Sequence, residues 1–249
     1  MIIKYQALTM QGQGRTNNED CYSVLPDDGL FMVSDGMGGH NAGEVASNIA
    51  INAVAYYLRQ NAGHKPADIL LEEAVSYANE QILTDSRKSD GHQNMGATLA
   101  AVWQQDDLLY VAHVGDSRVY VFNDEQARSL TRDHSLVGDL LREGVITAQQ
   151  AINHPQKNVL TRALGVEEQV LPDISVFEQP IPGFLLICSD GLSAYLPMEK
   201  VLPHIAARVK PEQMLPVLAE LAKEAGSNDD ITGVLLWQTE DTEEVSGND

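Results

Sequence analysis

The chain has 249 residues, of which 43% are hydrophobic, so it is long enough to bury one large core. Its formal net charge of −20 argues against nucleic-acid or anionic-membrane partners, because those need clustered Lys and Arg. The apolar runs are too short to cross a bilayer and MIIKYQ lacks the features of a signal peptide, so we expect a cytoplasmic protein without membrane insertion. Cys21 and Cys188 are too few for a disulfide framework, and we expect both thiols to be reduced.

The first half of the chain predicts a strand, a hairpin and two helices. In order, these are a strand over 2–9, hairpin strands over 21–25 and 29–34, a helix beginning after Asn41 and a helix over 66–86. Asn41 with Glu44 three residues later is typical of a helix start. Helical spacing places Tyr56 on the apolar face of the first helix and Ile69 on that of the second.

The second half changes to strand periodicity. The expected elements are strands over 97–104, 108–114, 118–123 and 127–131, a mixed segment over 134–165, strands over 173–179 and 183–189, helices over 197–208 and 211–225, and a strand over 230–238. Connections of two to five residues favour antiparallel pairing, because parallel neighbours need a longer crossover. Grouped strands and paired helices predict the α+β class. We expect one domain over 1–238 and a disordered acidic tail over 239–249.

Acidic residues recur where the predicted strands end. Asp35 ends LFMVSDG, Asp190 ends LLICSDG, Asp116 ends VAHVGD, and Asp20 and the pair Asp229–Asp230 precede further strands. Crowded carboxylates need protonation or a compensating cation, and Mg²⁺ and Mn²⁺ prefer oxygen ligands. Each Asp-Gly junction is also an ordinary turn, so the residues alone leave both interpretations open. The sequence contains no GxxxxGK[ST], HExxH or GxSxG motif.

Eight motifs between residues 5 and 237 resemble, in the same order, those of the PP2C (PPM) family of metal-dependent protein serine/threonine phosphatases, in its compact bacterial type. They are GRTNNEDCYSV, VSDGMGGHNAGEVAS, GATLAAVW, VAHVGDSRVYVF, TRDHSLVGDLLREGVIT, HPQKNVLTRALG, LLICSDGLS and GSNDDITGVLL. The resemblance implies an α-β-β-α sandwich of two antiparallel sheets flanked by pairs of helices. It also implies a metal site in a cleft at one edge of the sandwich.

The resemblance further implies roles for individual residues. Two Mn²⁺ or Mg²⁺ ions are expected on Asp35, which bridges them, on the Gly36 carbonyl, and on Asp20, Asp190 and Asp229, with Glu19 in support of Asp20 and a weaker third ion at Asp116. Arg15 is expected to bind the substrate phosphate. The implied reaction is the direct attack of a water activated between the two ions, without a phosphoenzyme.

Some positions depart from the family pattern. Met37 stands where eukaryotic members carry a histidine proposed as general acid, and nearby His40 could assist, although a structural role suits it better. Asp229–Asp230 replaces the usual Asp-Asn, so Asp230 is the alternative ligand to Asp229. In the segment 134–165, which corresponds to the flap beside the cleft, we interpret His134, His154 and Arg162 as structural or substrate-gating.

The expected substrates are proteins phosphorylated on serine or threonine by a bacterial kinase that this enzyme would oppose. Three alternatives remain: a non-catalytic binding module on the same fold, a two-metal hydrolase of nucleic acid or small phosphate esters, and a phosphatase of a partner-switching system. No long heptad pattern indicates a dimer, so we expect a monomer.

Overall fold

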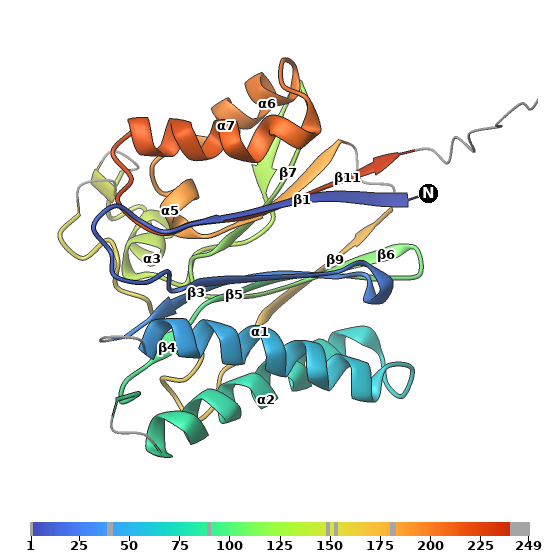
Figure 1. Ribbon diagram of the computed structural model, residues 1–249, viewed down its shortest axis with the longest axis vertical. Coiled ribbons are helices and arrows are strands. Elements are labelled where there is room, and N and C mark those ends of the chain that lie inside the picture. Colours follow the sequence, from blue (N-terminus) through green and yellow to red (C-terminus); the bar gives the residue numbers. More distant parts are fainter. Residues whose placement is uncertain are drawn as a thin grey trace, which may run out of the picture.

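Two antiparallel β-sheets lie face to face, and helices cover the outer face of each (Figure 1). The computed structural model describes residues 2–38, 42–88, 91–147, 150–151, 154–179 and 183–239. Helices therefore form the two outer layers and sheets the two inner ones. The α+β class and the sandwich of two antiparallel sheets are confirmed.

The elements follow one another in nearly the expected order. The strands are β1 (Ile2–Met10), β2 (Asp20–Leu25), β3 (Leu30–Met37), β4 (Gly96–Ala97), β5 (Leu99–Gln105), β6 (Leu108–Val114), β7 (Arg118–Phe122), β8 (Ala127–Ser129), β9 (Asp173–Glu178), β10 (Phe184–Cys188) and β11 (Ile231–Thr239). The helices are η1 (Pro26–Asp28), α1 (Ala42–Asn61), α2 (Ala67–Lys88), α3 (Leu136–Arg142), α5 (Asp190–Ser193), α6 (Met198–Ala206) and α7 (Pro211–Glu224). The first sheet has the order β1-β11-β10-β7-β8, and the second has β2-β3-β5-β6-β9, with β4 pairing with β3.

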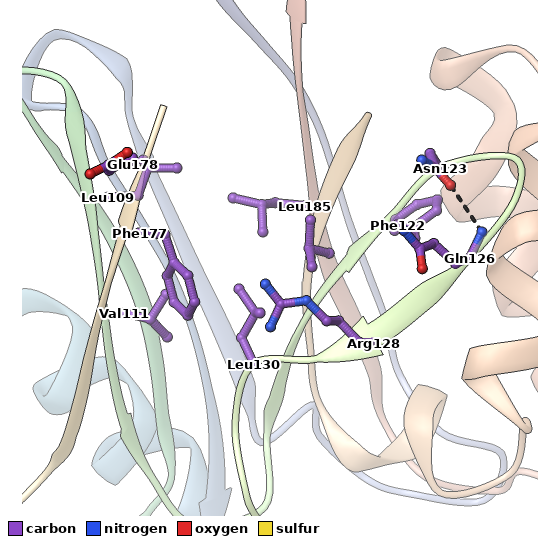
Figure 2. A pocket seen from close by; sticks show the side chains of 11 residues that line it. Leu109, Val111, Phe122, Asn123, Gln126, Arg128, Leu130, Phe177, Glu178 and Leu185 are labelled. Atoms are coloured by element: carbon purple, nitrogen blue, oxygen red, sulfur yellow. Dashed lines mark hydrogen bonds between the residues drawn. The ribbon is translucent and has the colours of Figure 1, made fainter. Parts of the chain in front are cut away.

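The strand period of two divides each sheet between two cores. On β3, Phe31 and Val33 face the first sheet, whereas Leu30 and Met32 face the helices. The core between the sheets is closed along most of its length. At the edge where β8 and β9 end the two sheets, a cavity of about 240 Å³ stays between them (Figure 2).

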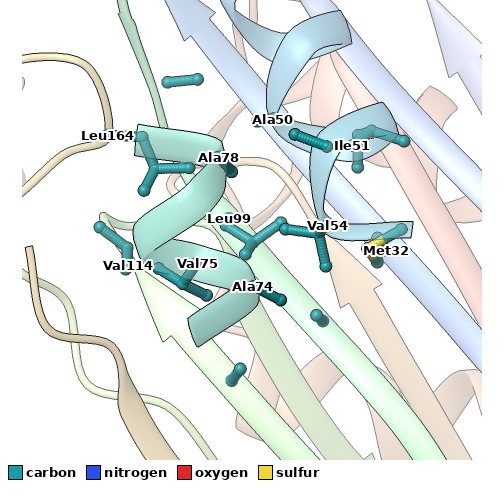
Figure 3. Close-up of a cluster of buried hydrophobic side chains, with 14 of the residues drawn as sticks. Met32, Ala50, Ile51, Val54, Ala74, Val75, Ala78, Leu99, Val114 and Leu164 are labelled. Atoms are coloured by element: carbon teal, nitrogen blue, oxygen red, sulfur yellow. The ribbon is translucent and has the colours of Figure 1, made fainter. Parts of the chain in front are cut away.

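Each pair of helices packs on its sheet through a separate core. Small residues such as Ala50 and Ala74 let α1 and α2 approach each other, and Val54 packs with them over Leu99 of the second sheet (Figure 3). On the first sheet, α6 and α7 bury a second cluster of apolar side chains, which includes Leu215. The helices are thus joined to the outer faces of the two sheets by buried apolar side chains.

Several expectations need correction. Tyr56 and Ile69 are 56% and 41% exposed, so they do not lie on the buried helix faces. The faces of α1 and α2 are built mainly from alanines and aliphatic residues, and Tyr56 instead packs its ring 6.1 Å from that of Tyr77 at the surface. The four-residue helix α5 was not expected, because a single turn leaves no periodic pattern.

Some expected features lie partly or wholly outside the described residues. Thr239, the first residue of the expected tail, is the last residue of β11, and 240–249 lie outside the described residues. The helix start at Asn41 and the neighbouring His40 lie outside them as well. Both cysteines are free thiols. Among the described helices, none is both long and apolar enough to cross a membrane.

Candidate active site

Five of the acidic residues meet at one end of the sandwich, where the chain passes between the two sheets. Asp20 begins β2 and lies directly opposite Asp35 on β3 as its cross-strand partner. Asp116 lies in the connection between β6 of the second sheet and β7 of the first. Asp190 begins α5 after β10, and Asp229 lies just before β11. We refer to these five residues as the carboxylate cluster.

The members of the carboxylate cluster repel one another in a mostly buried environment. Burial raises the pKa of Asp20 to about 7 and the pKa of Asp116 to about 8, and the charge on Asp190 adds to both shifts. Burial, with the charges on the other four members, raises the pKa of Asp35 well above its usual range. Burial and the charge on Asp229 also raise the pKa of Asp190. Such carboxyls ionise together only beside a compensating cation, so the cluster has the electrostatics of a cation site.

Among the described residues, no hydrogen-bond partner contacts two buried oxygens of the cluster, namely Oδ1 of Asp20 and Oδ1 of Asp190. A buried acceptor left unsatisfied costs about 1–3 kcal/mol, so both oxygens are suited to a cation. Within the described part of the chain, no three His, Cys, Asp or Glu side chains gather tightly enough to form a complete metal cage. Mg²⁺ and Mn²⁺ commonly keep several water ligands, so a spread set of carboxylates still fits them.

Thr98 fixes the end of the strand that carries Asp35. Its backbone N–H donates to the Asp35 carbonyl (2.8 Å), and its hydroxyl oxygen accepts a hydrogen bond from the Asp35 N–H (2.9 Å). The same hydroxyl lies 2.6 Å from Oγ of Ser117, which is next to Asp116. Thr98 and Ser117 are fully or almost fully buried. Together they connect the backbone at Asp35 with the connection that carries Asp116.

Ser189 plays a similar part for Asp20. Its hydroxyl donates to Oδ2 of Asp20 (2.7 Å) and accepts a hydrogen bond from the N–H of Thr232 on β11 (3.0 Å). Because Ser189 follows β10 and Asp20 begins β2, this contact joins the two sheets inside the site. The carboxylate is thereby oriented by one oxygen, and its other oxygen stays without a partner.

Arg15 lies in the connection between β1 and β2 and is surrounded by carboxylates. It forms ion pairs with Glu19 (3.1 Å), Asp229 and Asp230 (3.3 Å). Burial alone would lower the pKa of Arg15, but the charges on these carboxylates outweigh it and raise the pKa. The side chain is 35% exposed, so the guanidinium stays accessible beside the cluster.

The neighbouring residues Asp229 and Asp230 are placed differently. Asp230 is 2% exposed, and its two oxygens accept hydrogen bonds from the backbone N–H groups of Gly12 (2.7 Å) and Glu19 (2.8 Å). The Asp229 side chain is 26% exposed and faces Arg15. Because both oxygens of Asp230 hold the backbone, the geometry favours Asp229 over Asp230 as a residue that could bind a cation.

Gly36 lies where three backbone segments approach one another. Its N–H donates to the carbonyl of Glu19 (3.0 Å), and a Cβ at this position would overlap the carbonyl oxygen of Gly43 in α1. Burial raises the pKa of Glu19, whose carboxyl in turn lies against Gly43. Only glycine fits at position 36 without displacing α1. Met37 continues β3 behind it, partly buried.

Two of the three flap residues support the connection that carries Asp116. The N–H of His134 donates to the carbonyl of Gly115 (2.8 Å), and its Nδ1 accepts from the N–H of Gly115 (3.1 Å). Arg162 forms an ion pair with Asp173 (2.7 Å), which also lies 3.2 Å from Nε2 of His134. His154 hydrogen-bonds only within its own turn among the described residues.

Arg118 is a residue of the site that motif reasoning did not single out. Its guanidinium donates two hydrogen bonds to the carboxylate of Asp133 (2.7 and 2.6 Å). Its charge opposes the rise in the pKa of Asp116 and of Asp190. Arg118 therefore places a permanent positive charge behind the carboxylate cluster, held in position by Asp133.

Comparison with known proteins gives matches along most of the chain. The sequence model of the family Protein phosphatase 2C matches residues 11–228. The serine/threonine phosphatase stp of Listeria monocytogenes is 35% identical over 92% of this chain and 93% of its own. The crystal structure of the Mycobacterium tuberculosis serine/threonine phosphatase PstP/Ppp is 32% identical, with a TM-score of 0.87 over 96% of this chain and 100% of that one. A structure of the PstP catalytic domain in complex with two manganese ions is 31% identical, with a TM-score of 0.83 over 94% of this chain and 97% of that one.

Proposed function

The chain belongs to the protein phosphatase 2C family and is a metal-dependent serine/threonine protein phosphatase, and we propose that its reaction takes place at the carboxylate cluster. The observation that carries this proposal is the pair of unpartnered buried oxygens on Asp20 and Asp190, beside an accessible guanidinium at Arg15. The oxygens suit hard cations, and the guanidinium suits a phosphate.

The residues that would hold the divalent ions come from both sheets. They are the carboxylates of Asp20, Asp35, Asp190 and Asp229 and the carbonyl of Gly36. Asp116, in the connection between the two sheets, would hold a weaker third ion. The preferred ion is Mn²⁺ or Mg²⁺.

When bound, the two ions would supply a water nucleophile and stabilise the charge that develops during in-line displacement at phosphorus. Arg15 would orient the phosphate with its planar fork, once that fork is released from part of its contact with Asp229. Asp230 and Glu19 would keep Arg15 in place, because Asp230 holds the backbone of the same connection. No side chain forms a bond to phosphorus in this scheme, so no phosphoenzyme is expected.

Other functions have less support. A binding module without activity would have no need for buried, unpartnered carboxylate oxygens, because they cost stability. A nucleic-acid substrate is disfavoured by the net charge of −20. We propose phosphoproteins as substrates, a bacterial serine/threonine kinase as the opposing enzyme, a cytoplasmic location and a monomeric state.

The proposal is tested by phosphate release from a phosphothreonine peptide. The protein is treated with chelator, and Mn²⁺ or Mg²⁺ is then added back to the wild type, to Asp35→Asn and to Asp27→Asn. Asp27 is an exposed residue of η1. Asp27→Asn therefore changes the net charge by the same amount as Asp35→Asn, but at a position outside the carboxylate cluster. We expect Mn²⁺ to restore hydrolysis in the wild type and in Asp27→Asn but not in Asp35→Asn. Equal activity of Asp35→Asn and the wild type would show that the carboxylate cluster takes no part in the reaction.

A further inference from the structure

The cavity between the two sheets is separate from the carboxylate cluster. Val111 on β6 lies five residues before Asp116, and Leu185 on β10 lies five residues before Asp190. Three residues of extended strand, roughly 10 Å, separate them from the strand ends on the cluster side, Val114 of β6 and Cys188 of β10. The cavity therefore opens at the opposite end of these strands, and a ligand there would not touch the catalytic residues.

The cavity exists because the first sheet ends in a short edge strand. β8 has three residues and pairs with β7 over Tyr120–Phe122 alone, so it leaves the interior between the sheets uncovered next to β9. The walls are apolar side chains from both sheets: Leu109, Val111, Val121, Leu130, Phe177 and Leu185. Figure 2 shows Val111 and Phe177 facing Leu130 and Leu185 across the gap.

Arg128 of β8 brings a positive charge to this apolar space. Its side chain reaches into the gap between the sheets, and its guanidinium carbon lies 5.7 Å from the centre of the Phe177 ring (Figure 2). No carboxylate of the described residues lies within ion-pair distance of it, although the chain has 36 acidic residues and only 16 Lys and Arg. Glu178 lines the opposite rim without pairing with Arg128. The guanidinium thus keeps its hydrogen-bonding fork available to an anion from outside.

We propose that this cavity binds a small amphipathic carboxylate, with an unbranched alkyl chain between the sheets and its carboxylate on Arg128. The volume of about 240 Å³ corresponds to roughly eight water-sized groups. It is below the ~300 Å³ at which sites for drug-sized ligands begin. Two facing sheets lie about 10 Å apart, so one alkyl chain fits between their side chains. A carboxylate matches the fork of Arg128 in charge and in geometry.

The class of ligand follows from the apolar walls of the cavity and from the charged residue at its rim, taken together. The apolar walls favour a chain of methylene groups, because each one buried is favourable by the hydrophobic effect. The positive charge of Arg128 favours an anionic head group beside it, on the rim opposite to Glu178. This inference does not depend on the phosphatase activity, because the walls and Arg128 lie away from the carboxylate cluster.

Calorimetric titration of the full chain with octanoate tests the proposal. Chelator is present throughout, so that octanoate cannot bind through a metal ion. Wild type, Arg128→Gln and Leu130→Trp are compared, and Lys200→Gln serves as the control, because Lys200 is an exposed cation on α6. The half-buried Leu130 lines the cavity, so a larger side chain there fills it. Acetate and octyltrimethylammonium are titrated in parallel.

We expect saturable binding of octanoate to the wild type with a Kd on the order of 100 µM. Arg128→Gln should weaken binding about tenfold, Leu130→Trp should abolish it, and Lys200→Gln should leave it unchanged. Acetate and octyltrimethylammonium should give no saturable heat. The proposal is overturned if the wild type does not bind octanoate, if Arg128→Gln binds it as tightly as the wild type, or if octyltrimethylammonium binds equally well. Arg128 is exposed, so Arg128→Gln should fold normally. It therefore still tests the proposal if Leu130→Trp does not fold.

Discussion

Ser189 donates a 2.7 Å hydrogen bond to Oδ2 of Asp20, while Oδ1 of the same carboxylate is buried without a partner. The hydrogen bond orients the carboxylate and leaves one oxygen for an ion. Because Ser189 and Asp20 come from different sheets, the position of this carboxylate depends on how the sheets are docked. The polar residues behind the carboxylate cluster are therefore as informative to mutate as the carboxylates themselves.

Ser189→Ala should weaken metal binding with only moderate loss of stability. Removal of the hydroxyl leaves Oδ2 of Asp20 and the N–H of Thr232 without their partner. Loss of such a supporting contact costs about 10–100-fold in metal affinity or activity. The Mn²⁺ concentration that restores half of the activity should rise accordingly. Ser193→Ala is the matched control, because the hydroxyl of Ser193 is buried but lies 3.4 Å from a backbone carbonyl and touches no member of the cluster. An equal effect in both variants would contradict the specific role of Ser189.

Thr98→Val should disturb Asp35 and Asp116 together. The substitution keeps the shape but removes the hydroxyl that accepts from the Asp35 N–H and contacts Ser117. We expect a loss of about 1–3 kcal/mol in the free energy of unfolding, because buried polar groups are left unsatisfied. We also expect weaker Mn²⁺ binding, measured by calorimetry. Thr98→Ser keeps the hydroxyl and should restore the metal affinity even where its smaller side chain lowers stability. If Thr98→Ser also binds Mn²⁺ weakly, the loss of affinity in Thr98→Val comes from altered packing and not from the missing hydroxyl.

Asp229→Asn and Asp230→Asn should separate function from stability. Asp229 faces Arg15 and is partly exposed, so Asp229→Asn should lower metal affinity while the urea midpoint stays near that of the wild type. Asp230 holds the backbone at Gly12 and Glu19 and pairs with Arg15, so Asp230→Asn should lower the free energy of unfolding by about 2–4 kcal/mol. The opposite pattern, with Asp229→Asn the less stable protein, would make Asp230 the better candidate for the ligand.

Metal-free protein should lose stability as the pH rises. The pKa of Asp20 is about 7 and that of Asp116 about 8 in the folded chain, against a usual value of 3.8. Between about pH 4 and pH 8 the folded chain binds more protons at these two carboxyls than the unfolded chain does. Raising the pH through this range therefore favours unfolding. This contribution is fully present below about pH 4 and is lost as the pH rises through 7–8. Urea unfolding in chelator between pH 5 and pH 8 should show the decline.

Added Mn²⁺ should reduce the decline with pH, because ions replace the protons on the carboxylates. Asp35→Asn should also show a smaller decline, since it removes a carboxyl whose own pKa is raised well above its usual range by burial and by the other four members. A metal-free protein whose stability is constant or rises over this range would contradict the mutual repulsion of the carboxylate cluster.

The order and type of the elements could be predicted from the sequence because most of them are long and periodic. Continuous apolar runs in β3 and β5, and helical spacing in α1 and α7, leave a clear pattern of apolar residues. Side-chain exposure at the ends of the pattern could not be predicted, as Tyr56 shows, because periodicity does not reveal where the neighbouring layer ends. The single turn of α5 carries no periodic signal.

Within the site, the acidic residues could be predicted and their supports could not. A carboxylate at the end of an apolar run is visible in the sequence, as at Asp35 and Asp190. Thr98 and Ser189 are ordinary hydroxyl residues in the sequence. Their roles depend on hydrogen bonds to residues far away in the chain, from Asp35 to Thr98 and from Ser189 to Asp20. The only local signal is that Ser189 directly precedes an aspartate at a strand end. The difference between Asp229 and Asp230 likewise depends on the distant backbone at Gly12.

The carboxylate cluster draws Asp20 and Asp35 from one sheet, Asp190 and Asp229 from the other, and Asp116 from a crossing between them. Neither sheet supplies all five carboxylates by itself. A reaction at this cluster would therefore need both sheets to be docked, and a partly folded chain with only one sheet formed would be inert toward phosphorylated proteins.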